Sequence, residues 1–537
     1  MRFGIVRPWR AASSLALAAL VGAAGVISSG ATPSAATPSG GVGSLTQAID
    51  QVLADARLQG SQADVVVRSA TTGETLYNHL GTNRLVPASN DKAYSSLAAM
   101  QVLGPDYRFS TTVAAGGAQT GSALGGDLFL RGTGDPTLQP ADYDALAAAV
   151  AAAGVKVVSG RLVADDTFFD HRQYGDNWAW DNNPFSFQPE ISALTVAADA
   201  VFDVGSLTVE TRPGAAAAQP AVVRTVPATD FVHITNQATT AAAGSGDNIS
   251  VERRNGVNDI VVTGTIATDA GVDSTLSTVT DPTGYAAALF RDDLQRHGVR
   301  VAGPTVRGAT PAGARAITTR QSIPLSQLLI PFLKLSNNGH AEILVKAMGA
   351  KVQGVGSWDA GLPSVTSVAS QLGVDTGTVQ IVDGSGLSNL DFIPALQTTN
   401  LLIGAQKEPW FQTWFDALPI AGQSDPLVGG TLRHRMTGTP AAGNVHAKTG
   451  TLTGASALSG YVTDADGERL VFSIMENNYL SGAPKDLEDA IAIDLAEFSR
   501  TSGVPASRAA TARPAMTRPA LDPHGHAVEC SWTRSGC

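Results

Sequence analysis

Lysine is scarce in this sequence of 537 residues, because only eight of its 36 basic side chains are lysines. Acidic residues outnumber basic ones, and the formal net charge is -11. This balance argues against a nucleic-acid partner, since phosphate binding needs a basic surface. Hydrophobic residues make up 43% of the chain, which is ample for buried cores, and the length predicts more than one domain.

Cysteine and metal-ligand patterns are also sparse. The two cysteines, Cys530 and Cys537, both lie in the last eight residues, where they could close a small loop in an oxidising compartment. The nine histidines are scattered without the spacing of metal ligands. The G-x-S-x-G turn of α/β-hydrolases does not occur. We therefore predict no metal site and no catalytic cysteine.

Long apolar runs are confined to the N-terminus. Three arginines in residues 1–10 precede an apolar run at 11–27, and small residues follow, with Ser29-Gly30-Ala31 as the candidate cleavage site. This is the pattern of an export signal, which we place at residues 1–36. A retained membrane anchor is the alternative, although the run is short and interrupted by glycine. No later stretch is long and apolar enough to predict a membrane span.

The amino-acid composition and local pattern of the chain change twice along its length. Residues 44–107 and 318–502 combine helical and strand-like segments, whereas 108–317 is rich in Gly, Thr, Val and Asp in short β-like runs. We predict an α+β catalytic domain made from the first two ranges, with an antiparallel sheet flanked by helices and closed by both chain ends. Residues 108–317 would form one or more inserted domains, mostly β, with cores of their own. The tail, 503–537, is predicted to be disordered.

Three local patterns support this fold prediction. Ser44 and Gln47 form a capping-box pattern at the start of a predicted helix. Asp466-Gly467 predicts a hairpin turn between two strands. In the last predicted helix Leu487, Ile491, Leu495 and Phe498 fall on one face.

The most informative lysine is Lys92, three residues after Ser89 and at the start of a predicted helix. None of the other seven lysines has serine at that position. Residues three apart share one face of a helical turn. A serine hydroxyl needs a base to become a nucleophile, and lysine in a dry pocket can be that base, whereas arginine does not deprotonate. Alone, the pattern is weak, because a capping serine followed by a solvated lysine also produces it.

Two further motifs follow in the chain. Ser336-Asn337-Asn338 occupies a turn between two helical segments, and Lys448-Thr449-Gly450 lies in a predicted strand. The order S-x-x-K, S-x-N, K-T-G is that of penicillin-recognising serine acyl-transferases. Over about residues 44–500 the chain resembles the class C low-molecular-mass penicillin-binding proteins, the D-alanyl-D-alanine carboxypeptidases/endopeptidases of peptidase family S13. Sequence blocks such as "LGPDYRFST", "LRGTGDPTL" and "HAKTGTLTGASALSGYV" carry this resemblance.

The resemblance implies a penicillin-binding-protein/β-lactamase-like transpeptidase fold and a role for each motif residue. Ser89 would be the nucleophile and Lys92 the base. Ser336, Asn338 and Lys448 would complete the catalytic set. Thr449, Gly450 and Thr451 would form the substrate-binding strand, and the backbone N–H groups of Ser89 and Thr451 would form the oxyanion hole.

The function implied is removal of the terminal D-alanine from peptidoglycan stem peptides by an exported protein found outside the cell or at the cell wall. Cleavage of D,D-crosslinks is a second activity that the resemblance allows. β-Lactam antibiotics would bind covalently, and no cofactor is expected. A β-lactamase and a non-catalytic cell-wall-binding protein of the same fold are the alternatives.

Three features near the motifs receive structural interpretations. We expect Asp91 to point away from the site, because a carboxylate beside Lys92 would favour the protonated amine. The turn at 383–388, "DGSGLS", is expected to lie near the site without a chemical role. His340 and His446 are expected to serve packing.

Overall fold

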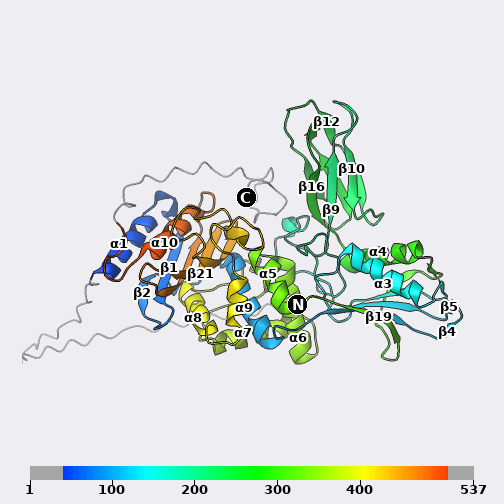
Figure 1. The fold of residues 1–537 in the computed structure, drawn as a ribbon, viewed down its shortest axis with the longest axis horizontal. Helices are drawn as coiled ribbons and strands as arrows, with labels where there is room; N and C mark the ends of the chain where they lie inside the picture. Colours follow the sequence, from blue (N-terminus) through cyan, green and yellow to red (C-terminus); the bar gives the residue numbers. More distant parts are fainter. Residues whose placement is uncertain (1–39, 506–537) are drawn as a thin grey trace, which may run out of the picture. The chain divides into compact units, whose positions relative to one another are not determined.

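The computed structural model describes residues 40–505. The predicted signal at 1–36, both cysteines and most of the predicted disordered tail lie outside the described residues. A five-stranded antiparallel sheet, in the order β2-β1-β22-β21-β20, joins the two ends of the described chain (Figure 1). Its strands are β1 (Gln62–Ser69), β2 (Thr75–His79), β20 (His446–Leu452), β21 (Ala455–Thr463) and β22 (Arg469–Asn477). The predicted closure of one sheet by both chain ends is confirmed.

Alternate residues of the sheet enter two different cores. In β22, Val471 and Met475 pack in one hydrophobic cluster, whereas Phe472 and Ile474 pack in another. This follows from the period of two in a strand, which sends successive side chains to opposite faces. The second cluster lies under two helices from opposite ends of the chain, α1 (Gly41–Leu53) and α10 (Lys485–Glu497).

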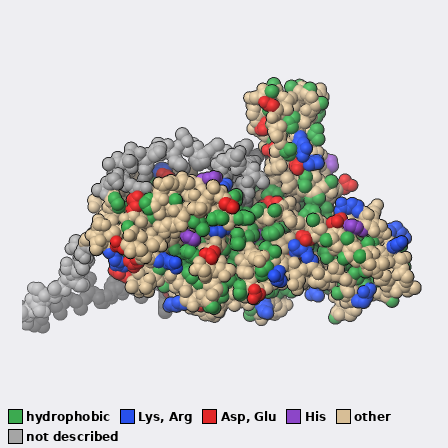
Figure 2. Space-filling view, in the orientation of Figure 1, with side chains coloured by type: hydrophobic (Ala, Val, Ile, Leu, Met, Phe, Trp, Pro, Cys, Tyr) green, Lys and Arg blue, Asp and Glu red, His purple; other side chains and the backbone are tan. Residues whose placement is uncertain are grey.

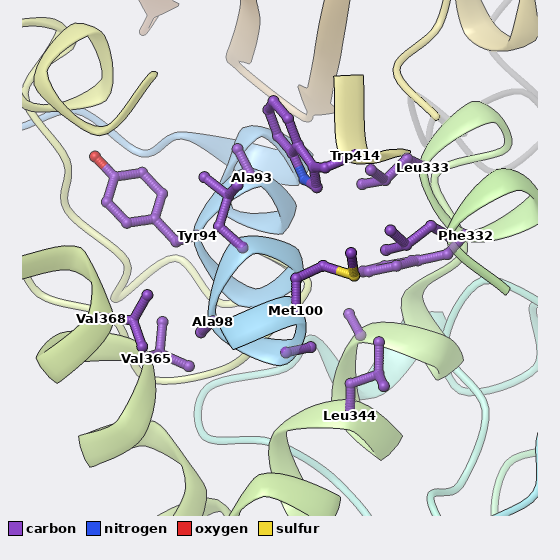
Figure 3. Close-up of a cluster of buried hydrophobic side chains, with 14 of the residues drawn as sticks. Ala93, Tyr94, Ala98, Met100, Phe332, Leu333, Leu344, Val365, Val368 and Trp414 are labelled. Carbon is purple, nitrogen blue, oxygen red and sulfur yellow. The ribbon is translucent and has the colours of Figure 1, made fainter. Parts of the chain in front are cut away.

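The first cluster is built by helices on the other face of the sheet. These are α2 (Lys92–Val102), α5 (Leu325–Lys334), α6 (Asn338–Gln353), α7 (Trp358–Gln371), α8 (Ala395–Ala405) and α9 (Phe411–Asp416). Helix α2 lies at the centre, with Tyr94 directed to one side and Met100 toward Phe332 and Leu344 on the other (Figure 3). Residues 92–100 are all buried, as expected for a helix surrounded by protein.

The segment between α2 and α5 forms further sheets. A five-stranded sheet has the order β18-β8-β6-β3-β19, and a four-stranded sheet has the order β17-β7-β5-β4. Their strands are β3 (Ser110–Ala115), β4 (Gln119–Thr120), β5 (Ala123–Leu124), β6 (Leu128–Gly132), β7 (Val157–Val158), β8 (Leu162–Asp165), β17 (Arg300–Val301), β18 (Thr305–Arg307) and β19 (Arg315–Gln321). Two helices, α3 (Pro140–Ala152) and α4 (Pro282–Arg296), pack in this part.

A smaller all-β part lies within the same segment (Figure 1). It contains the sheets β10-β9-β16, β11-β14-β13 and β12-β15. The strands are β9 (Ser206–Arg212), β10 (Val222–Val226), β11 (His233–Asn236), β12 (Thr239–Ala241), β13 (Ser250–Arg253), β14 (Asp259–Thr263), β15 (Thr265–Ala267) and β16 (Asp273–Thr278). Because β3 pairs with β19, the chain leaves and re-enters this segment on adjacent antiparallel strands.

The middle segment has a core of its own and also shares the core around α2. Its own cluster contains Leu130, Tyr143, Phe290 and many other buried residues. The cluster around α2 also includes residues from the middle segment, namely Phe109, Phe169, Ile191, Ala193 and Val204. Part of the segment is therefore packed directly against the helices that carry the sequence motifs.

Some local predictions hold and one does not. The Asp466-Gly467 turn joins β21 to β22 as predicted, with Gly467 at φ 83°. Helix α1, however, begins at Gly41 and not at Ser44. The Gly41 N–H donates to the carbonyl of Arg500 (3.1 Å), and the Ser44 hydroxyl contacts the backbone of Val504. Long-range contacts with the C-terminal segment thus replace the predicted capping box.

The surface carries both signs of charge. Acidic and basic side chains are interspersed on the face shown in Figure 2. Among residues 40–505, no helix has the length and apolar character needed to cross a membrane.

Candidate active site

Ser89 lies in a short 3₁₀ turn, Ala88–Asp91, that leads directly into α2. Ala88 has φ 48°, a left-handed conformation that costs a non-glycine residue about 1–2 kcal/mol. The surrounding structure must therefore hold this turn in place. Ser89 is 4% exposed and Lys92 is fully buried, so the sequence pattern does not mark a solvated cap.

The ammonium group of Lys92 points at the predicted nucleophile. Its Nζ donates to Ser89 Oγ at 2.7 Å, to Asn338 Oδ1 at 2.5 Å and to the carbonyl of Ser385 at 2.8 Å. These three contacts match the three donors of a lysine side chain. A neutral Lys92 in the same place would be within reach of the Ser89 proton, which is the geometry required of a general base.

The second motif occupies the turn between α5 and α6. Ser336 has φ 59°, and the Asn337 side chain caps α6 by accepting from the His340 N–H. Asn338 is the first residue of α6, and its amide faces two ways. Its Oδ1 accepts from Lys92, and its Nδ2 donates to the carbonyl of Phe187 at 2.7 Å.

The third motif lies on β20, the edge strand of the sheet. Lys448 Nζ donates to Ser336 Oγ at 2.8 Å and to the carbonyl of Thr449 at 2.7 Å. The Thr449 hydroxyl donates to Thr431 Oγ1 at 2.8 Å. Thr451 lies two residues further along the strand, opposite Ser456 of β21.

Gly450 lets this strand approach the turn Ala88–Asp91, called the nucleophile turn because it carries the predicted nucleophile Ser89. A Cβ atom at Gly450 would lie 2.6 Å from the carbonyl oxygen of Pro87 and 3.1 Å from the Asn90 nitrogen. The Asn90 side chain closes the same junction by donating to the carbonyl of Lys448 at 3.2 Å. The structure thus brings all eight predicted site residues to one place, where three chain segments meet.

Asp91 corrects one expectation, because it does not point away from the site. It is fully buried, and its carboxyl group lies close to those of Asp383 and Asp391. Burial raises the pKa of Asp91 well above its usual value, Asp383 and Glu342 raise it further, and Lys92 lowers it. The residue before a lysine at a helix start cannot be oriented from spacing alone, and here the side chain is covered by the 383–391 segment.

The 383–388 turn has a closer relation to the chemistry than predicted. The Asp383 carboxylate accepts from the backbone N–H groups of Ser385, Gly386 and Ser388, and from Trp178 Nε1. This holds the Ser385 carbonyl where it receives the Lys92 ammonium. The sequence shows the motif itself. It cannot show that the Ser385 carbonyl accepts from Lys92, because every residue type has a backbone carbonyl. The same is true of the Phe187 carbonyl.

Two nearby histidines take packing positions. His340 is buried, its Nε2 donates to the carbonyl of Phe202 at 2.8 Å, and burial lowers its pKa to about 4. The His446 ring stacks on Phe415 at 4.3 Å between centroids, and burial, followed by the charge of Lys334, lowers its pKa to about 4. Neither ring contacts Ser89 or Lys92 among the hydrogen bonds of the described chain.

Comparison with known proteins now adds the family. The model of the D-Ala-D-Ala carboxypeptidase 3 (S13) family matches residues 45–498. The chain belongs to this family. A D-alanyl-D-alanine carboxypeptidase from an Actinomadura species is 44% identical over 494 residues, which cover 91% of this chain and 90% of that protein.

A more distant relative and a solved structure are also similar to this chain over most of its length. The D-alanyl-D-alanine carboxypeptidase DacB of Haemophilus influenzae is 26% identical over 432 residues, covering 80% of this chain and 88% of that protein. The crystal structure of penicillin binding protein 4 (dacB) from the same organism superposes with a TM-score of 0.71 at 24% identity, covering 83% of this chain and 98% of that one. The predicted α+β fold of the penicillin-binding-protein type is confirmed.

Proposed function

We propose that this S13 family member is a serine D,D-peptidase that removes the terminal D-alanine from peptidoglycan stem peptides through an acyl-enzyme. The observation that carries the proposal is the 2.7 Å contact between Lys92 Nζ and Ser89 Oγ in a fully buried setting. The 44% identity to a D-alanyl-D-alanine carboxypeptidase supports the substrate class.

In the acylation step, Ser89 Oγ attacks the carbonyl carbon of the penultimate D-alanine. The hydroxyl proton passes to a neutral Lys92, and the carbonyl oxygen becomes an oxyanion. Asn338 keeps Lys92 in line with Ser89 through its Oδ1, and it is itself fixed by the Phe187 carbonyl. This fixed geometry lowers the entropic cost of bringing nucleophile and base together.

Collapse of the tetrahedral intermediate breaks the C–N bond and needs a proton for the leaving amine. Ser336 would give its hydroxyl proton to that amine and take in return the proton held by Lys92, which becomes neutral again. The 2.8 Å contact from Lys448 Nζ to Ser336 Oγ supports this role by orienting the hydroxyl. Water then hydrolyses the ester and returns Ser89 to its starting state. Lys448 also supplies positive charge for the free carboxylate of the substrate, with Thr449 and Thr451 as the hydroxyl donors.

The oxyanion would be held by the backbone N–H groups of Ser89 and Thr451. Such donors each contribute about 3 kcal/mol to transition-state stabilisation in comparable hydrolases. The close approach of β20 to the nucleophile turn at Gly450 supports this assignment, because it brings the two backbones side by side.

The proposal also covers where the protein acts and which other compounds react with Ser89. The N-terminal pattern supports export, with action at the cell wall, where the proposed substrate is found. β-Lactam antibiotics resemble the acyl-D-Ala-D-Ala backbone and would acylate Ser89. Cleavage of D,D-crosslinks is compatible with the same chemistry, since it also breaks a bond to a D-alanine carbonyl.

Intact-mass measurement after incubation with benzylpenicillin tests the proposal. The wild-type protein should gain one drug mass, and Ser89→Ala should gain none. The wild-type protein should also release D-alanine from a synthetic acyl-D-Ala-D-Ala peptide, and the variant should not. Equal labelling of the Ser89→Ala variant would remove Ser89 as the nucleophile. An adduct lost within seconds, with rapid turnover of the drug, would favour a β-lactamase instead.

A further inference from the structure

Three buried carboxyl groups gather directly behind the nucleophile turn. One oxygen each from Asp91, Asp383 and Asp391 lies within 4.8 Å of the others, and all three residues are fully buried. Asp91 is next to Lys92 in the chain, and the other two come from the segment that follows α7. The catalytic chemistry proposed above does not use any of the three.

The hydrogen bonds of this cluster are unequally shared. Asp383 accepts four, from three backbone N–H groups and from Trp178. Asp391 accepts one, from the Val382 N–H to its Oδ1 at 2.7 Å. In the described chain, both oxygens of Asp91 and Oδ2 of Asp391 have no donor, although they are buried. Asp91 therefore brings a carboxyl group without any donor into the cluster, and Asp391 Oδ2 faces only the neighbouring carboxyl of Asp383.

The nearby ammonium gives Asp91 no hydrogen bond. Lys92 is the adjacent cation and its charge acts on Asp91, but it donates to Ser89, Asn338 and the Ser385 carbonyl, and both Asp91 oxygens stay without a donor. A buried carboxylate without a donor or a counter-charge is strongly unfavourable. A proton on one carboxyl supplies a single donor, whereas a cation can contact all three oxygens at once.

The donor set determines which cation fits. Carboxylate oxygens are the ligands preferred by hard cations. Calcium takes oxygen ligands at about 2.3–2.6 Å in flexible geometry, so oxygens that lie within 4.8 Å of one another can share one ion. Magnesium demands near-ideal octahedral geometry and usually keeps several waters, which a buried cluster offers less readily. We propose that Asp91, Asp383 and Asp391 form a calcium site behind the nucleophile turn.

Such an ion would act through the position and charge of its neighbours. It would tie the nucleophile turn to the 383–388 turn, whose backbones already touch: a Cβ at Gly386 would lie 1.9 Å from the Ala88 carbonyl oxygen. A divalent ion would offset much of the negative charge that the three carboxylates bring together. By joining the two turns, the ion would also fix the Ser385 carbonyl that accepts from Lys92. This departs from the expectation that no metal site exists.

Thermal unfolding with and without calcium tests the site directly. The full-length protein is stripped with EDTA during partial unfolding, refolded, and scanned in 1 mM CaCl₂, in 1 mM MgCl₂ and in EDTA at constant ionic strength. We expect calcium to raise the Tm by at least about 3 °C over EDTA, with a smaller effect of magnesium. Elemental analysis of the calcium-loaded protein should find about one calcium per chain.

Matched variants locate the ion. Asp91→Asn and Asp391→Asn should lose most of the calcium-dependent Tm shift. Asp64→Asn, which changes another buried carboxyl with an unpartnered oxygen, on β1, should keep it. Equal Tm values of the wild-type protein in calcium and EDTA, with no bound calcium, would overturn the proposal and leave shared protons as the means of neutralisation. A calcium shift that survives in both Asp91→Asn and Asp391→Asn would overturn the location.

A second readout concerns catalysis and rests on the proposed function. Benzylpenicillin acylation of the wild-type protein should slow by about tenfold in EDTA and recover on adding CaCl₂. Loss of the calcium effect on acylation with the Tm shift intact would show that the ion does not influence Lys92. Failure of all penicillin labelling, by contrast, would bear on the proposed function and not on the calcium site.

Discussion

At the scale of single residues, the candidate site depends on properties that similar residue types do not share. Lys92 can lose its proton, which arginine cannot do in a protein. Ala88 and Ser336 both adopt left-handed backbone conformations, and one precedes the nucleophile while the other is the proposed proton relay. Backbone strain of this kind persists only where the surrounding packing fixes it. The two left-handed residues therefore indicate that the candidate site is rigid.

Replacing Lys92 tests the role of its proton. Lys92→Arg keeps the charge but removes the base, so we expect the rate of penicillin acylation to fall about 10³-fold or more. Lys448→Arg, the control, keeps the positive charge that this residue supplies and should lose far less. Stopped-flow measurement of acylation gives both rates. A near wild-type rate in Lys92→Arg would show that another group takes the Ser89 proton.

The residues of the site could be predicted because their signals are short. Ser89 and Lys92 share one helical turn, and the Ser336 and Lys448 motifs each fit within three residues. The sequence could not indicate the carbonyls of Phe187 and Ser385, since any residue type offers a carbonyl. It also could not orient Asp91, whose burial depends on a segment about 290 positions further along the chain.

Among the structural elements, β20 and the nucleophile turn make the closest approach. Gly450 is the residue that allows it, because its missing side chain leaves room for the Pro87 carbonyl. The same principle explains why α1 begins earlier than its capping pattern predicts. A Cβ at Gly41 would lie 2.1 Å from the carbonyl oxygen of Ser499, so contact with the C-terminal segment determines where the helix starts. Local propensity is overridden where distant segments touch.

Gly450→Ala should separate these two elements. The added methyl group must displace either the strand or the turn, and misplacement by about 1 Å can cost about 10²-fold in rate. We expect acylation to slow by that order and the free energy of unfolding to fall by about 1–3 kcal/mol. Gly313→Ala is the control, because a Cβ there meets nothing within 4 Å. If Gly450→Ala acylated like wild type, the close approach would not matter for the chemistry.

At the scale of the whole molecule, the middle segment participates in the core around α2. Phe109, Phe169 and Val204 are among its residues in that core, and the Phe187 carbonyl reaches Asn338. The composition change at 108 and 318 marked where the segment leaves and returns, but composition cannot reveal which of its side chains face the catalytic helices. Its division from the rest stays a prediction, but the shared core leads us to expect that the catalytic part depends on it.

Replacing residues 108–317 by a short Gly/Ser linker tests that division. We expect the shortened protein to be insoluble or to lose penicillin labelling, because the deletion uncovers the core and removes the partner of Asn338. Phe169→Ala, a milder change in the same shared core, should lose about 3–5 kcal/mol of stability and keep labelling. Circular dichroism and labelling stoichiometry give the comparison. A folded deletion protein with full labelling would show that the segment is dispensable for the site.

The central sheet has one more consequence, for how the chain is made. Strand β1 lies between β2 and β22, and its residue Gln62 is paired with Asn477. Synthesis begins at the N-terminus, so β1 can pair only with β2 until almost the entire sequence has been synthesised. Lys448, which completes the contact with Ser336, arrives just as late. The site proposed around Ser89 therefore stays incomplete throughout most of synthesis, and its last contacts form only when the closing strands arrive.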